Sequence, residues 1–163
     1  MRVKLEWLNE LVDLTGLSLE EIVKTVSLYS IEVEGVEKMV HASDIVIGHV
    51  LTKEPHPDSD HLNLLTVDVK DEVLNIVCGA PNVEKGQYVI IAKIGCELDG
   101  FTIKKSKIRG YESCGMCCSL QELGIEKKYI EDKYANGIYY FEDEVEVGME
   151  ASKALNLHDP VIE

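Results

Sequence analysis

The first part of the chain carries apolar side chains at helical spacing. The positions that recur every three or four residues are Leu5, Leu8, Leu11 and Val12. This spacing places them on one face and predicts an amphipathic helix of about two turns within residues 1–14, which Gly16 should end. Ser18 and Glu21 fit a capping box, so a second helix is predicted over about 19–28. The residues that this helix should bury are Ile22, Val23 and Val26.

From residue 44 onward the pattern changes to the alternation of β-strands, which residues 31–34 already show in a short stretch. The longer ranges with strand character are 45–51, 65–69, 73–77, 88–94 and 138–141. Gly48 is expected to allow a coil or bulge within the first of these strands. Residues 53–61 contain two prolines and many polar side chains, which predicts a loop. The second and third strands should form a hairpin.

Between residues 101 and 108, the apolar residues change from odd-numbered to even-numbered positions. Phe101 and Ile103 would face one side of a strand, whereas Ile108 falls on the other parity. Because successive side chains of a strand point to opposite faces, one continuous strand cannot bury all three. The pattern therefore predicts a bulge or break near Lys105 or Ser106.

The remaining pattern completes a fold-class prediction. A second capping box at residues 119–122 predicts a short helix that Gly124 ends, and another helix is expected over about 150–155. Five or so short strands with turn signals and one or two small helices, spread over about 110 residues, suit a small barrel such as an OB fold. The fold class is therefore α+β or mainly β.

Composition narrows the class of protein. The chain has 163 residues, enough for one domain or two small ones, with 45% apolar and 28% charged residues. Its formal net charge of -14 argues against broad, non-specific binding to nucleic acids. No apolar run is long enough to cross a membrane, and the charged N-terminus is not a signal peptide, so a cytoplasmic location is expected. Five cysteines, an odd number, suit a reducing compartment.

A local reversal of charge stands out against this acidic background. Within six positions the chain places Lys104, Lys105, Lys107 and Arg109, with no acidic residue between them. Such a cluster at a strand or turn is suited to contacting a phosphate backbone through charge, without reading sequence. Tyr111 is the best candidate for stacking on a base, although it could equally close the barrel. Ser113 could donate to a phosphate or cap a turn. The alternative is a solvated, charged strand.

Two other groups of residues could carry chemistry. His56, Asp58, Asp60 and His61 could be imagined as a metal site, but a polar loop is the favoured interpretation because no complete ligand set is visible. Cys114 and Cys117 form a lone CxxC without the second pair that a zinc site needs, and they are interpreted as incidental thiols. No nucleophile-and-base arrangement or glycine-rich phosphate loop is present, so no catalysis is predicted.

Two long motifs carry a resemblance to a known family. Residues 45–62, with the loop His-Pro-x-x-Asp-x-Leu at 56–62, resemble the opening of the tRNA-binding barrel of the endothelial-monocyte-activating polypeptide II family. Residues 107–116 are similar to that family's closing motif, Lys-(Leu/Ile)-Arg-Gly-x-x-Ser-x-Gly-Met. Other parts of the chain resemble the start of bacterial phenylalanyl-tRNA synthetase β subunits. These parts are Trp7-Leu8, residues 31–34, Cys78 to Asn82 and residues 159–163. This second resemblance covers essentially the whole chain.

The resemblance implies a domain plan. An OB-fold tRNA-binding domain over residues 41–151 would be inserted into a small α+β domain. The outer domain would consist of a helix-helix-strand lead-in over 1–40 and the start of its returning half over 152–163, where the chain is expected to be truncated. The segments before about 40 and after about 151 would pack together. The chain is thus expected to be an N-terminal fragment of a longer protein.

The resemblance also implies a function and partners. The fragment would bind tRNA, specifically tRNA-Phe, and would support aminoacylation in the full enzyme, where the β chain pairs with a catalytic α subunit. It would need no cofactor itself, whereas the parent enzyme would use ATP and Mg. The RNA-contacting residues would be Lys104, Lys105, Lys107, Arg109, Tyr111 and Ser113. The alternatives are a scaffold barrel with little RNA binding, a free-standing tRNA-binding or chaperone-like barrel, and, last, a redox or metal protein.

Overall fold

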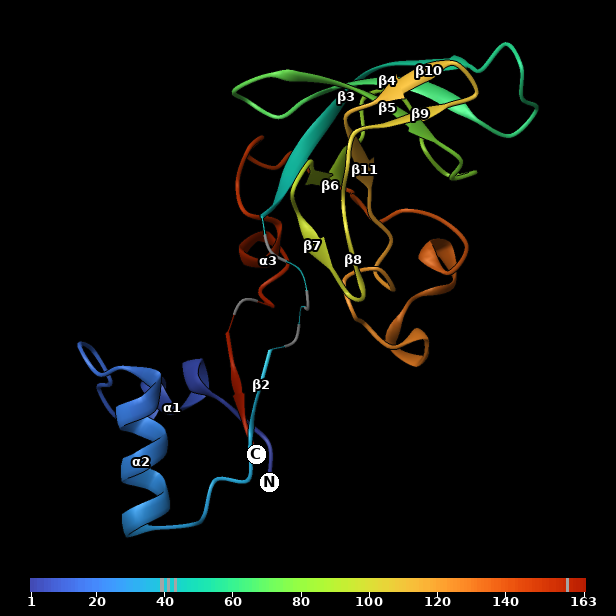
Figure 1. Cartoon of the computed structure of the whole chain (residues 1–163). Helices are drawn as coiled ribbons and strands as arrows, with labels where there is room; N and C mark the ends of the chain where they lie inside the picture. Colours follow the sequence, from blue (N-terminus) through green and yellow to red (C-terminus); the bar gives the residue numbers. More distant parts are fainter. Residues whose placement is uncertain (39, 41, 43, 158) are drawn as a thin grey trace. The chain divides into compact units, whose positions relative to one another are not determined.

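The chain divides into two compact units. The computed structural model describes residues 1–163 except 39, 41, 43 and 158. One unit comprises residues 1–39 and 156–163, and the other comprises residues 40–155 (Figure 1). Among the described residues, no helix combines the length and the apolar character needed to traverse a lipid bilayer.

The smaller unit joins its two chain segments in one sheet. Its elements are β1 (Val3–Lys4), α1 (Leu5–Leu11), α2 (Leu19–Tyr29), β2 (Val36–Glu37) and β13 (Val161–Ile162). The sheet order is β1-β13-β2, with antiparallel pairs on both sides of β13. Both predicted helices are confirmed, and Ser18 and Glu21 form the predicted capping box. The first helix ends at Leu11, however, well before Gly16.

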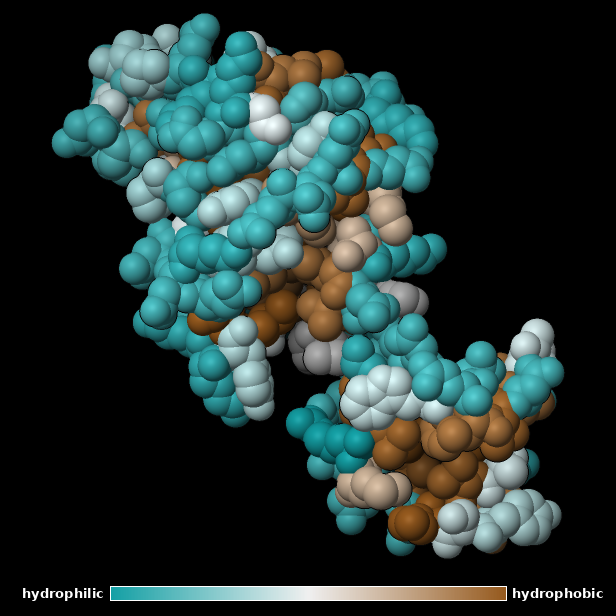
Figure 2. Space-filling model, turned by 180° about the vertical axis from the view of Figure 1, so that it is seen from behind, coloured by the Kyte–Doolittle hydropathy of each residue, from teal (hydrophilic) through white to brown (hydrophobic). Residues whose placement is uncertain are grey.

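The predicted strand over 31–34 is wrong. The strand in this region is β2, which starts at Val36. Upstream of it, the Val33 N–H donates to Ser27 Oγ at 3.2 Å instead of to a neighbouring strand, although Gly35 still hydrogen-bonds to the Glu163 backbone. The unit also buries little. Of the side chains predicted to be buried on α2, Ile22 is buried and Val23 and Val26 are half-buried. Figure 2 shows apolar side chains gathered on a face of this unit. The exposed apolar residues of the unit include Leu28 and Ile31.

The larger unit is mainly β, with a nearly closed, barrel-like sheet. The strands of this sheet are β3 (Ile45–Pro55), β4 (Asn63–Asp68), β5 (Val73–Cys78), β6 (Tyr88–Lys93), β11 (Gly115–Cys117) and β12 (Tyr140–Phe141). Their order is β11-β6-β3-β4-β5, with β12 also paired to β6, and all pairs are antiparallel. The Cys114 N–H donates to the Asn75 carbonyl at 2.8 Å, which brings the two ends of the sheet together. The predicted hairpin of β4 and β5 is confirmed.

The core of this unit comes from the inward-facing side of the strands. Val50, Val67 and Ile91 are fully buried there. Gly48 lies at a close approach of three strands, since a Cβ at this position would stand 2.5 Å from Val67 Cγ1 and 2.7 Å from Ile91 Cγ1. The irregularity in β3 falls between Val50 and Thr52, so Gly48 is needed for space and the predicted bulge lies further along the strand.

Short elements complete the larger unit. They are β7 (Glu97–Leu98), β8 (Phe101–Thr102), β9 (Ser106–Ile108), β10 (Tyr111–Ser113), the 3-10 turns η1 (Lys127–Tyr129) and η2 (Asp132–Tyr134), and α3 (Ala151–Ala154). The predicted break is confirmed, because β8 and β9 are separated at residues 103–105. The predicted loop starts later than expected, since β3 continues to Pro55. At Ser119 and Glu122 the capping-box hydrogen bonds form, but the residues that follow make a turn and the predicted helix is absent.

Candidate nucleic-acid interface

The predicted basic residues lie on a two-stranded hairpin and on the segment that leads into it. In the hairpin β9–β10, Lys107 lies opposite Glu112 and Ile108 lies opposite Tyr111. The two-residue turn is formed by Arg109 and Gly110, whose φ angles are 45° and 90°. Positive φ at both turn positions matches the twist of a hairpin, which explains a glycine here and leaves Arg109 in a conformation that few side chains adopt.

The structure brings the two long sequence motifs together at this hairpin. Arg109 Nη1 donates to the Asp58 carbonyl at 2.6 Å, which ties the turn to the loop after β3. From the same loop, His56 Nε2 lies 3.4 Å from the Ile108 carbonyl. The His56 ring also meets the Tyr111 ring edge-on, with 4.9 Å between the ring centroids. The loop therefore holds the hairpin at its turn and at the adjoining end of each strand.

His56 has a structural part that the sequence did not reveal. Its side chain is buried, and its Nδ1 accepts the backbone N–H of Asp58 at 3.0 Å. Because Nδ1 accepts, the ring proton belongs on Nε2, which faces the Ile108 carbonyl. The sequence placed His56 in a polar loop, and its position in the first motif was the one signal of a special role. Within the described residues, no three His, Cys, Asp or Glu side chains are arranged to hold a metal ion.

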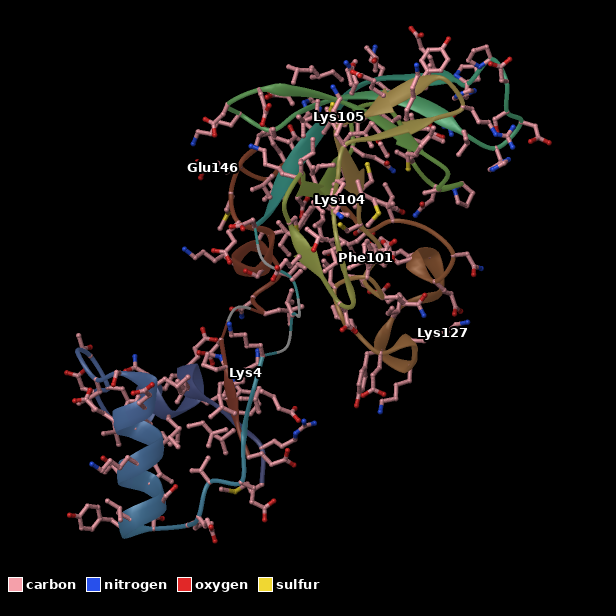
Figure 3. All side chains as sticks on the ribbon, in the orientation of Figure 1. Lys4, Phe101, Lys104, Lys105, Lys127 and Glu146 are labelled. Carbon is pink, nitrogen blue, oxygen red and sulfur yellow. The ribbon has the colours of Figure 1, made fainter. Side chains whose placement is uncertain are left out.

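The four basic side chains differ in how far they are already engaged. Lys105 Nζ lies 3.0 Å from Glu112 Oε2, and this hydrogen-bonded ion pair raises the pKa of Lys105. Arg109 is exposed but uses one nitrogen on the Asp58 carbonyl. Lys104 and Lys107 are exposed, and in the part of the chain that the structure describes neither takes part in an ion pair. Figure 3 shows Lys104 and Lys105 on the segment that leads from β8 to β9.

Tyr111 and Ser113 lie on the same strand but face different surroundings. Tyr111 is 41% exposed and borders a hollow of about 340 Å³ over β4 and β5, so its ring can be reached from solvent. Ser113 is buried, and its Oγ donates to the Gly115 carbonyl at 3.0 Å and accepts the Val77 N–H at 3.1 Å. This geometry favours the turn-supporting role for Ser113 over phosphate contact, because its hydroxyl already has partners inside the barrel.

Acidic groups surround the hairpin as well. Glu112 lies on β10 itself, and Asp58 and Asp60 belong to the loop that supports the turn. The pKa of Asp60 is lowered, chiefly by a hydrogen bond with His61 and in small part by the charge of Arg109. The local surface is therefore mixed in charge, and its cations without an ion pair among the described residues are Lys104, Lys107 and Arg109, of which Arg109 donates to a backbone carbonyl.

Comparison with known proteins places this geometry in context. The chain is 49% identical, over 166 aligned positions, to the "Phenylalanine--tRNA ligase beta subunit" of Geobacillus kaustophilus and 48% identical to that of Bacillus subtilis. Each alignment covers 100% of this chain and 21% of the relative, so the chain spans about a fifth of the length of these curated relatives. The solved "MetRS related protein from Pyrococcus horikoshii" is 22% identical, with a TM-score of 0.45, covering 64% of this chain and 84% of that one.

A family model matches the larger unit. It is described as "Putative tRNA binding domain" and aligns with residues 45–150, a range that runs from the start of β3 to the residue before α3. The match includes the loop after β3, the hairpin β9–β10 and the basic segment that leads into it. The chain therefore belongs to this family of tRNA-binding domains.

Proposed function

We propose that the chain is the tRNA-binding module of a phenylalanyl-tRNA synthetase β subunit and contacts the phosphate backbone of tRNA-Phe. The observation that carries this proposal is the pair of exposed lysines, Lys104 and Lys107, which lie on the segment leading into the hairpin and on its first strand. The loop of the other family motif contacts the turn of this hairpin. Lysines without an ion pair can neutralise phosphates and release counterions without first breaking an internal contact. Lys105 and Arg109 add charge at the same edge, and Tyr111 offers an accessible ring on which a base could stack.

The strand order supports an OB-fold assignment for the larger unit. Numbered along the chain, its five main strands are β3, β4, β5, β6 and β11, and the ring runs β3-β4-β5-β11-β6. A five-stranded, partly open Greek-key barrel of this kind is the architecture of OB folds. We propose further that this barrel is inserted into a small α+β domain. The position of β13 between β1 and β2 supports that proposal, since it joins segments from both sides of the barrel in the sequence.

The proposal assigns the chemistry of aminoacylation to other parts of the enzyme. In a full synthetase, the module would deliver or hold tRNA while a catalytic α subunit, using ATP and Mg, carries out the reaction. The chain itself would have no aminoacylation activity and no cofactor. A scaffold role is the rival interpretation, and the formal net charge of -14 favours it because the whole-molecule field repels RNA.

Binding of bulk tRNA as a function of salt concentration tests the proposal. The test variant is Lys104→Ala/Lys107→Ala, and the matched control is Lys85→Ala/Lys127→Ala, which removes two exposed lysines elsewhere (Lys127 is seen in Figure 3). Each lost phosphate contact should reduce the slope of log K against log salt by roughly 0.7–0.9. We therefore expect the test variant to lose affinity and about 1.4–1.8 of slope.

The control separates a local surface from a general charge effect. If the control loses as much affinity and slope as the test variant, only overall charge matters and the hairpin is no interface. If the native chain does not bind tRNA even at about 50 mM salt, the scaffold interpretation replaces the proposal.

A further inference from the structure

Two cysteines lie at matching heights on the strands that close the barrel. Cys78 is the last residue of β5, and Cys117 is the last residue of β11. Four antiparallel pairs separate these strands around the sheet, so β5 and β11 run in the same direction. Their backbones meet where Cys114 N–H donates to the Asn75 carbonyl, and Cys78 and Cys117 each lie three residues further along. Adjacent strands lie ~4.8 Å apart, which is within the Cα separation that a disulfide spans.

The two thiols contact one another and share access to solvent. Their side chains hydrogen-bond to each other. Both line an open cavity of about 560 Å³, whose wall also includes Gly79, Ala80 and Lys104. Each residue is 6% exposed and borders the cavity, so a small oxidant can approach both residues from solvent.

The surroundings distinguish the two sulfur atoms. The hydrogen bond from Cys117 lowers the pKa of Cys78 and outweighs burial, which raises it. The Ala80 N–H and the charge of Lys53 act in the same direction as the hydrogen bond. The hydrogen bond to Cys78 raises the pKa of Cys117, and burial and the charge of Glu122 add to this. A thiolate is the nucleophilic form of cysteine, so we assign the attacking role to Cys78, whose thiolate is favoured over that of Cys117.

We propose that Cys78 and Cys117 form a hydroperoxide-sensitive dithiol, a modification site whose cavity borders the RNA-contacting surface at Lys104. The Cys78 thiolate attacks one oxygen of a hydroperoxide, the O–O bond breaks, and Cys78 becomes a sulfenic acid while hydroxide or alkoxide leaves. The Cys117 sulfur then attacks the Cys78 sulfur, which expels the oxygen as water once the Cys117 proton is transferred, and the disulfide forms. Two thiols are oxidised and one peroxide is reduced, so the electrons balance.

The other cysteines provide the contrast. Cys114 is more exposed and forms the CxxC pattern with Cys117, but it lines a different hollow, beside Lys93 and Lys105. Burial raises the pKa of Cys118 and raises that of Cys96 to about 11, which keeps both in the thiol form. Exposure alone therefore predicts oxidation at Cys114, whereas the spatial pair predicts it at Cys78 and Cys117.

The test is peroxide treatment of the reduced chain, blocking of remaining thiols with iodoacetamide, and peptide mapping by mass spectrometry. We expect Cys78 and Cys117 to become resistant to alkylation together and to appear as one disulfide-linked peptide pair. The Cys114→Ser variant should still form this linked pair, and the Cys78→Ser variant should not. In Cys117→Ser the second step is blocked, so dimedone should trap the sulfenic acid on Cys78.

Two results would overturn the proposal. One is full alkylation of Cys78 and Cys117 after peroxide while Cys114 is oxidised, and the other is a disulfide that joins different cysteines. The peptide map of the native chain alone distinguishes these outcomes from the expected one. It does so even if a serine variant fails to fold, a failure that circular dichroism would detect. The result is independent of tRNA binding, because the readout is covalent.

Discussion

Replacing Ser113 with alanine removes one oxygen atom that holds two backbone groups inside the barrel. The Val77 N–H would lose its acceptor at 3.1 Å, and the Gly115 carbonyl would lose a donor at 3.0 Å. Leaving a buried donor without a partner costs about 1–3 kcal/mol. We therefore expect Ser113→Ala to lower the free energy of unfolding by roughly 2 kcal/mol, and to leave the tRNA affinity of the folded protein unchanged.

Ser106 offers a matched control, because it lies directly opposite Ser113 in the hairpin but is exposed. Ser106→Ala should change the free energy of unfolding by less than about 0.5 kcal/mol. Urea unfolding followed by near-ultraviolet circular dichroism of tyrosine reports mainly on the larger unit, since Tyr29 alone of the tyrosines lies outside it, whereas Trp7 reports on the smaller unit. An unchanged urea midpoint together with a loss of tRNA affinity would refute this reasoning and assign the Ser113 hydroxyl to RNA.

Two further predictions concern packing and capping. Gly48→Ala should lower the free energy of unfolding by about 1–3 kcal/mol through overpacking. The double variant Gly48→Ala/Val67→Ala should be less destabilised than the sum of the two single-variant effects, which a double-mutant cycle of urea unfolding measures. Strict additivity would contradict the contact. In the capping box, the hydrogen bond from the Ser18 N–H lowers the pKa of Glu21 in the folded state. The stabilisation by the ionised Glu21 carboxylate is therefore present above its ordinary pKa of 4.5 and is lost as the pH falls through the lowered pKa. The difference in free energy of unfolding between the native chain and Glu21→Gln should therefore shrink as the pH is lowered, which urea titrations at several pH values measure. A difference that stays constant with pH would argue against the cap.

Local patterns predicted most of the elements, because their causes are local. The capping box at Ser18 needs only the chemistry of four consecutive residues, and it forms as predicted. The break between β8 and β9 follows from the parity of a strand alone. The errors arose where a partner decides the outcome, as at residues 31–34, where the Val33 N–H donates to Ser27 Oγ instead of to a neighbouring strand. At Ser119 the capping bonds form, but a helix does not follow them.

The candidate site shows the same division. The order of residues is enough to place cationic side chains at 104–109 and to show that the closing family motif, residues 107–116, begins among them. The folded chain was needed to show which of those cations are engaged, because the ion pair of Lys105 and the contact of Arg109 with the Asp58 carbonyl depend on how the hairpin folds and which loop meets it. It also paired Cys117 with Cys78 instead of Cys114, since closure of a barrel joins residues that are far apart in the chain. Periodicity records which way a side chain faces, but contacts across a closed sheet depend on strand order and register.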